Sequence, residues 1–200
     1  MDKKGALVLG LVALITIVVA AHLLMPYFLP VEQSMSERMI IVASDVPGEG
    51  WESVVATSGL WYDGTVRAYT RYNLTDAAYS EVFPAKTNGR LIYTFLINFN
   101  TSADAETAYL NSYMNFADAG MSPYFNADEL SKFGDRSFAS SYHYPLRNND
   151  HTVTAWVLKD NFYFFQMFFW ADGHGFTDAE MLQMVKIQAD KIMTDEGQTE

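Results

Sequence analysis

The sequence predicts an α+β fold in which a mainly antiparallel sheet of about six strands is covered by helices and preceded by one N-terminal transmembrane helix. Strand-like segments fall into two groups. Each group is followed by a segment with helical spacing, an order typical of an antiparallel sheet with helices packed on it. The transmembrane helix is predicted from residues 5–25, an apolar run without Asp, Glu, Lys or Arg. About 20 apolar residues suffice for a helix to cross a hydrocarbon layer roughly 30 Å thick.

The residues on either side of this run predict its orientation. Lys3 and Lys4 precede it, and the next Lys or Arg is Arg38. Because positive charge favours the cytoplasmic side, we expect a single-pass protein of the cell membrane with its N-terminus in the cytoplasm and its domain outside. The alternative is a secreted protein whose signal peptide is cleaved near Ala21, because residues 19–21 are small enough for a cleavage site.

The predicted organisation has five parts, of which one is a folded domain long enough to bury a sizeable core. The parts are a cytoplasmic tail at residues 1–4, a transmembrane anchor at 5–27, a linker at 28–37, an extracytoplasmic α/β domain at 38–193 and a flexible tail at 194–200. The linker is short, so we expect the domain to lie close to the bilayer. The first partner predicted for the chain is therefore membrane lipid, contacted by the anchor.

Charge and cysteine content exclude several classes of function. The net charge is −11, which argues against binding to nucleic acid, because such binding depends on Lys and Arg at phosphates. The same charge argues against docking on anionic lipid through a basic patch. The chain has no cysteine, which excludes disulfides, thiolate metal sites and a cysteine nucleophile.

Hydrophobic periodicity locates the individual elements. Strands are expected at residues 38–44, 51–58, 60–72, 77–83, 91–99, 137–144, 151–159 and 162–170. Helices are expected at residues 101–119, over a short turn at 126–133, and after the Thr-x-x-Glu capping box at 177–180. The predicted buried stripes are Ala103, Leu110, Tyr113, Met114 and Ala117 in the first long helix, and Leu182, Val185, Ala189 and Ile192 in the last.

The segment at residues 162–170, FYFFQMFFW, is apolar on both faces of a strand. One face carries Phe162, Phe164, Gln166, Phe168 and Trp170, and the other carries Tyr163, Phe165, Met167 and Phe169. Such a strand must be central and covered on both sides, or one face must be kept for a partner.

Three parts of the sequence resemble the PsbP/Mog1-like α/β sandwich. They are residues 45–51 (DVPGEGW), residues 133–135 (FGD), and the final aromatic strand with the capped helix that follows it. The resemblance extends roughly over residues 38–192. It implies a small extracytoplasmic domain that acts as an accessory, binding or assembly factor. The family has no shared active site, so the resemblance assigns no role to any residue of this chain.

Residues with catalytic or metal-binding potential are few. The candidates for metal ligands are His143, His151 and His174, but a metal site needs three or four converging ligands and these residues have no known ligand spacing. No hydrolase elbow, phosphate loop or dinucleotide fingerprint occurs, so we predict no catalytic residue and no cofactor.

Two other features remain open at the level of sequence. Asn73 and Asn100 each begin an N-glycosylation sequon. The domain is also rich in tyrosine, which is explained either by core packing or by an aromatic groove for a ligand. The tyrosines concerned are Tyr69, Tyr72, Tyr79, Tyr93, Tyr109, Tyr113, Tyr124, Tyr142, Tyr144 and Tyr163.

Together these patterns indicate a membrane-anchored extracytoplasmic domain that serves as a binding, sensor or accessory module. Its partner outside the cell would be a protein or a small ligand. Two alternatives remain: an extracytoplasmic hydrolase or metal-dependent enzyme that uses the histidines, and a structural protein of the cell envelope, which the sequons suggest.

Overall fold

The computed structural model describes residues 33–57, 59–85, 89–118, 122–124, 127–144, 150–171 and 175–196. From Ser34 onward these residues belong to one compact unit. The predicted cytoplasmic tail and anchor lie outside the described residues, as do the last four residues of the predicted tail. No helix within the described ranges combines the length and the apolar character needed to cross a membrane.

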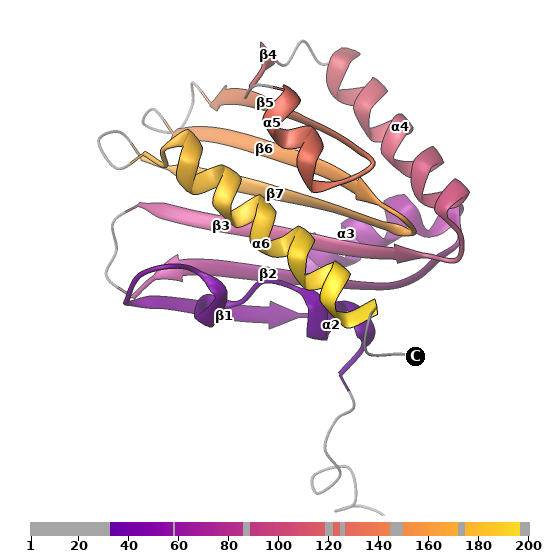
Figure 1. Cartoon of the computed structure of the whole chain (residues 1–200), viewed down its shortest axis with the longest axis horizontal. Helices are drawn as coiled ribbons and strands as arrows, with labels where there is room; N and C mark the ends of the chain where they lie inside the picture. The colour runs from indigo at the N-terminus through magenta and orange to yellow at the C-terminus, as the bar shows by residue number, and fades with distance from the viewer. Residues whose placement is uncertain are drawn as a thin grey trace, which may run out of the picture. The chain divides into compact units, whose positions relative to one another are not determined.

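The domain is built on one antiparallel sheet of seven strands in the described residues (Figure 1). In spatial order the strands are β1 (Trp51–Ala56), β2 (Leu74–Pro84), β3 (Arg90–Phe99), β7 (Phe162–Trp170), β6 (Asp150–Lys159), β5 (Arg136–Tyr144) and β4 (Ser122–Pro123). The α-helices are α2 (Met35–Met39), α3 (Leu60–Tyr69), α4 (Ser102–Asp118), α5 (Ala127–Leu130) and α6 (Asp178–Glu196). The described residues also include three short 3₁₀ helices: η1 (Ala43–Asp45), η2 (Thr70–Tyr72) and η3 (Ser131–Phe133). The predicted α+β class and mainly antiparallel sheet are confirmed for this part of the chain.

Strand β7 lies near the middle of the sheet and separates two hydrophobic cores. On one face, α6 lies across the strands (Figure 1) and packs Met181, Val185 and Ile192 into the core that contains Phe164 and Phe168. On the other face, α4 buries Ala105, Ala108 and Tyr109 in a second core with Ile97, Trp156 and Tyr163. The central, doubly covered position expected for residues 162–170 is therefore confirmed for the first half of β7.

The prediction of a strand at residues 38–44 is wrong. The chain forms helix α2 instead, because Ser34 and Glu37 make a capping box in which each side chain accepts a hydrogen bond from the other residue's backbone amide. The apolar residues that suggested a strand, Met39, Ile40 and Ile41, are buried beneath α6 without a strand partner. Helix α2 also includes residues 35–37, which the sequence had assigned to the linker.

A second correction concerns residues 60–72, which were expected to form a strand and form α3 and η2 instead. Among the side chains described in α3, Tyr62, Thr65, Val66 and Tyr69 are partly buried, and their spacing follows one face of a helix. The Tyr62 hydroxyl donates a hydrogen bond to the carbonyl of Ala77 at 3.2 Å, which fixes the helix on β2. The alternation at residues 66–72 suggested the two-residue period of a strand. The observed contacts with the sheet instead follow the 3.6-residue period of a helix.

Helix α4 has the predicted position but the opposite face inward. Leu110, Tyr113 and Met114 of the predicted buried stripe are exposed, with Met114 58% accessible. The buried positions are instead Ala105, Ala108, Tyr109 and Ser112. The two alanines let the helix approach the bulky aromatic residues of β3 and β7 closely, which larger side chains at these positions would prevent.

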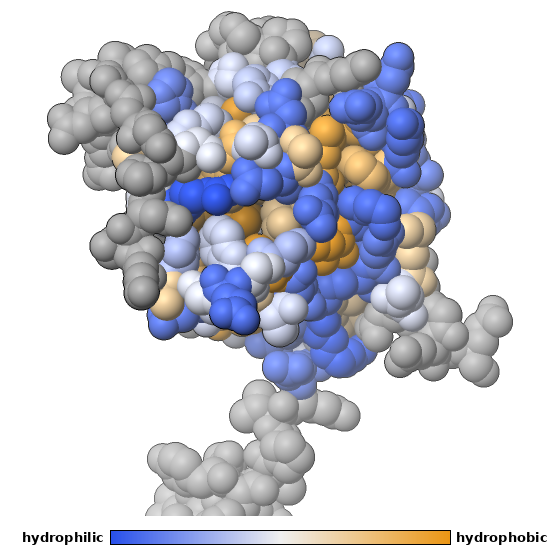
Figure 2. Space-filling model, turned by 60° about the vertical axis from the view of Figure 1, so that its left-hand side comes forward, coloured by the Kyte–Doolittle hydropathy of each residue, from blue (hydrophilic) through white to orange (hydrophobic). Residues whose placement is uncertain are grey.

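The surface in Figure 2 is mainly hydrophilic, with smaller hydrophobic areas lying between the charged and polar residues. This distribution agrees with the acidic composition and with a domain surrounded by water on this side.

Close backbone packing at Gly134 yields the first prediction. A Cβ at Gly134 would lie 2.4 Å from the carbonyl oxygen of Leu158, and the next amide, that of Asp135, donates to this oxygen at 2.8 Å. Gly134→Ala should therefore lower the free energy of unfolding by about 1–3 kcal/mol, because the backbone of β6 must move. At Gly64, an exposed position of α3, an added Cβ would meet no other atom within 4 Å, so Gly64→Ala should raise stability slightly. Urea denaturation of both variants measures the difference, and equal effects would contradict the packing argument.

The second prediction concerns Gln188 of α6. Its side chain is buried, accepts a hydrogen bond from the Ile41 amide at 2.9 Å and donates one to the Met39 carbonyl at 3.1 Å. Gln188→Met keeps the volume but leaves two buried backbone groups unpaired, so stability should fall by about 2–4 kcal/mol. Gln183→Met, at an exposed position of the same helix, should change stability by less than about 0.5 kcal/mol. A similar melting temperature for both variants would show that water replaces the lost bonds.

Candidate functional site

One face of the sheet carries a row of aromatic side chains that the described helices cover only in part. The row, called the aromatic surface below, comprises Tyr79 of β2, Tyr93 and Phe95 of β3, and Phe165 and Phe169 of β7. The strand register and the alternation of side chains put all five on the face that carries α4. Tyr79 and Phe95 are buried, whereas Tyr93, Phe165 and Phe169 remain partly exposed.

The rings of the aromatic surface contact one another across three strands. Tyr79 stacks with Tyr93 at a centroid distance of 5.7 Å, and Phe95 stacks with Phe165 at 4.8 Å. Phe169 meets Tyr93 edge to face at 5.2 Å. Such pairs add to the stabilisation from area burial, and they hold each ring in one orientation. The five rings therefore form one packed layer on this face of the sheet.

Glu81 places one carboxylate beside these rings. It follows Tyr79 on the same face of β2 and accepts a hydrogen bond from the Tyr79 hydroxyl. Burial and the neighbouring Glu81 carboxylate both raise the pKa of Tyr79 above its ordinary value. The same two causes, in the same order, raise the pKa of Tyr93. Both phenols are therefore neutral at physiological pH, and the single hydroxyl proton of Tyr79 is already donated to Glu81.

A second cluster lies on the opposite face and is centred on Arg90. The guanidinium group lies 3.9 Å from the ring centroid of Phe176 and 5.7 Å from that of Trp51. It also pairs with Glu180 of α6 at 2.9 Å. Cation–π contacts and a carboxylate pair use both the flat faces and the edge of the guanidinium group, which is the arrangement that arginine suits. This cluster connects the start of β3, the start of β1 and the start of α6.

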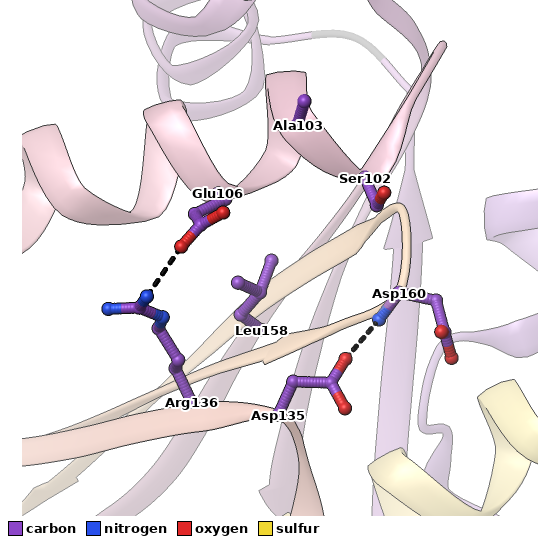
Figure 3. A pocket seen from close by; sticks show the side chains of 7 residues that line it. All are labelled: Ser102, Ala103, Glu106, Asp135, Arg136, Leu158 and Asp160. Carbon is purple, nitrogen blue, oxygen red and sulfur yellow. Dashed lines mark hydrogen bonds and ion pairs between the residues drawn. The ribbon is translucent and has the colours of Figure 1, made fainter.

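A small hollow beside the first turn of α4 has a volume of about 240 Å³ (Figure 3). It is lined by Ser102, Ala103, Glu106, Asp135, Arg136, Leu158 and Asp160. Its charged groups are already paired: Arg136 with Glu106 at 2.6 Å, and Lys159 with Asp160 at 2.6 Å. Asp135 accepts a hydrogen bond from the Asp160 amide at 2.8 Å. These contacts explain the hollow as the junction between α4 and the β6–β7 turn.

Of the three candidate histidines, His151 is the one whose side chain the structure describes. His143 and His151 are directly opposite each other in the register of β5 and β6, as the hairpin prediction implied. The His151 ring stacks on Trp170 at 5.7 Å, whereas the side chain of His143 and all of His174 lie outside the described residues. No group of three or more potential metal ligands occurs among the residues that are described.

The two sequon asparagines are brought together by the fold. Both are exposed, and the Asn100 amide donates to the Asn73 carbonyl at 3.1 Å. Asn73 adopts a left-handed conformation with φ of 56°, and its side chain donates to Asp104 at 2.9 Å. Whether the sequons are used stays a prediction.

Part of the aromatic surface is predictable from the sequence. The alternation of residues in 162–170 puts Phe165 and Phe169 on one face of their strand, and Tyr79 and Tyr93 are among the tyrosines of a potential groove. The sequence did not predict that Glu81 lies beside the aromatic surface or that Arg90 is the centre of the second cluster. The only available signal for Glu81 was its alternation with Tyr79 in β2, and no local pattern marks Arg90, because its partners lie far away in the chain.

The fold belongs to the class of antiparallel sheets with helices on both faces, and comparison with solved structures supports this assignment. The chain is similar to the extracellular domain of PknH from Mycobacterium tuberculosis, with a TM-score of 0.59 over 82% of this chain and 98% of that one. The sequence identity is 9%, so the likeness concerns the fold alone. No family model matches the sequence. A search of curated proteins likewise finds no match.

The third prediction concerns Glu180. Burial alone would raise the pKa of this carboxyl, but hydrogen bonds from the Thr177 amide and from Arg90 outweigh it and hold the pKa below the ordinary 4.5. The resulting stabilisation is complete above pH 4.5 and is lost as the pH falls through the lower, folded-state pKa. Because the Glu180 side chain is 42% exposed, solvent screening limits the effect to about 0.5 kcal/mol.

Glu180→Gln should accordingly flatten the fall of unfolding free energy between about pH 5 and pH 3 relative to the unchanged protein. Denaturant melts at a series of pH values measure this slope. Glu129→Gln, at an exposed position of α5, controls for the change in net charge. Parallel pH curves for the unchanged protein and Glu180→Gln would refute the assigned role.

Proposed function

We propose that this chain is an extracytoplasmic binding domain that recognises a protein partner through the aromatic surface. The observation that carries the proposal is the partial exposure of Tyr93, Phe165 and Phe169, three rings of one face of the sheet that are linked by ring contacts through the buried Tyr79 and Phe95. Aromatic residues are enriched at the centres of protein interfaces, where rigid rings bury much area at little cost in conformational entropy. Glu81 and the Tyr93 phenol, which are both partly exposed, supply polar groups beside these rings.

The location outside the cell rests on two supports. One is the predicted anchor at residues 5–27 with Lys3 and Lys4 before it. The other is the likeness of the fold to a domain that is itself extracellular. The resemblance to the PsbP/Mog1-like group points in the same direction, since it implies an accessory or assembly factor. In this proposal the membrane keeps the domain close to a partner that is also held at the cell surface.

The fourth prediction tests this function with Phe169→Ala. Full-length tagged protein is captured from detergent-solubilised native membranes, and co-purified proteins are quantified by mass spectrometry. We expect a stoichiometric partner whose recovery falls at least about tenfold in the variant, because truncating a central aromatic residue typically costs 1–2 kcal/mol or more of binding.

The matched control is Tyr113→Ala, which removes an exposed aromatic side chain from α4, outside the aromatic surface. This variant should retain the partner. Melting temperatures of both variants establish that each is folded. The proposal fails if no stoichiometric partner is found, or if the partner is retained equally by both folded variants.

A further inference from the structure

Strand β1 forms one edge of the sheet, with β2 on its inner side and no described strand on its outer side. The direction of its backbone groups follows from the contacts at its start. The Ala85 amide donates to the Gly50 carbonyl at 2.6 Å, so even-numbered residues direct their hydrogen-bonding groups toward β2. Pro84, which has no N–H, is opposite Trp51, in agreement with this pattern. Trp51, Ser53 and Val55 therefore direct their amides and carbonyls away from the sheet.

The side chains of β1 do not protect this edge. Natural edge strands are commonly shielded by Lys, Pro or a bulge, and β1 contains none of these. Its single charged residue is Glu52. Val54 and Val55 are instead 51% and 38% exposed, although both are β-branched residues suited to pairing in a sheet.

Two copies of this strand fit each other in one register. A two-fold axis perpendicular to the sheet pairs residues whose numbers are both odd or both even, because facing side chains must lie on the same side. Only the odd residues have free backbone groups, and centring on Ser53 uses all three of them. Ser53 then faces Ser53 of the second copy, and Trp51 faces Val55 of the second copy.

The side chains are complementary in this register. Trp51 and Val55 form an aromatic–β-branched pair on each side of the axis, a combination that stabilises antiparallel strands. Glu52 faces Val54 of the second copy, so no two carboxylates are directly opposite each other. The small Ser53 side chains meet at the centre, where bulkier groups would be most crowded.

We propose that β1 pairs antiparallel with β1 of a second copy of this chain, centred on Ser53, so that the two sheets become one continuous sheet. The axis is perpendicular to the sheet and therefore brings both aromatic surfaces to the same side of the dimer. A partner with two equivalent sites would then bind with an avidity that neither domain has alone. This inference uses a different surface from the proposed function and stands or falls independently of it.

The fifth prediction compares Ser53→Pro with Ser53→Ala in the full-length chain solubilised in detergent. The Ser53 amide does not bond to β2, so proline at this position of an edge strand should leave the melting temperature within a few degrees. It removes a donor from the centre of the dimer and places its ring against the second copy. Light scattering over a concentration series should show a dimer for the unchanged chain and Ser53→Ala, and at least tenfold weaker dimerisation for Ser53→Pro.

Cysteine cross-linking gives an independent measurement, since the chain has no cysteine of its own. Facing residues of a hydrogen-bonded antiparallel pair have Cα atoms about 5.5 Å apart, which suits a disulfide. Ser53→Cys should form a covalent dimer under mild oxidation, whereas Thr107→Cys, exposed on α4, should not. A monomeric unchanged chain, equal dimerisation of the proline and alanine variants, or equal cross-linking of the two cysteine variants would each overturn the proposal.

Discussion

The fold depends on the burial of a strand that is apolar on both of its faces. Tyr163 and Phe164 are neighbours in β7, point to opposite sides of the sheet and are both fully buried. Removing each such side chain from water contributes about 1.5–3 kcal/mol, and an edge position or a single helical layer would forgo half of this gain. The strand is therefore central, and α4 and α6 lie on opposite faces of the sheet. The close packing of Ala105 and Ala108 and the buried bonds of Gln188 hold these two layers in place.

Coverage of β7 is uneven along its length, and this unevenness creates the candidate site. Near its start, both faces are covered by described helices. Further along, Phe165 and Phe169 stay partly exposed on the α4 side, while Phe168 is buried against the opposite layer. Apolar area of Phe165 and Phe169 therefore stays in contact with water on this face of the sheet. Partners bind where apolar area can still be removed from water, which connects the architecture of the sheet to the proposed binding function.

The elements that sequence analysis predicted correctly are those with strong local patterns, such as residues 91–99, 151–159 and 162–170. The errors occur where distant contacts decide. Ile41 looked like a strand residue, but its amide bonds to Gln188, which lies 147 positions away. The inward face of α4 could not be read from hydrophobicity, because Leu110 and Met114 are more apolar than the alanines that are buried. The aromatic residues of the row can be read from the sequence. Which of them stay partly exposed cannot, because their exposure depends on where α4 crosses the sheet.

The β1 edge and the aromatic surface are adjacent at β2, but their contact groups point in different directions. The free groups of Trp51, Ser53 and Val55 lie in the plane of the sheet, while the rings of Tyr93 and Phe169 project perpendicular to it. Glu81 lies between them, opposite Val54 in the register and bonded to the Tyr79 hydroxyl. Pairing at the edge therefore leaves the aromatic face accessible, and a partner on that face leaves the edge free. The two proposals are therefore compatible: the proposed dimer at the edge and the proposed partner on the aromatic surface do not compete, and the anchor predicted at the N-terminus would favour both contacts by confining the copies to one membrane.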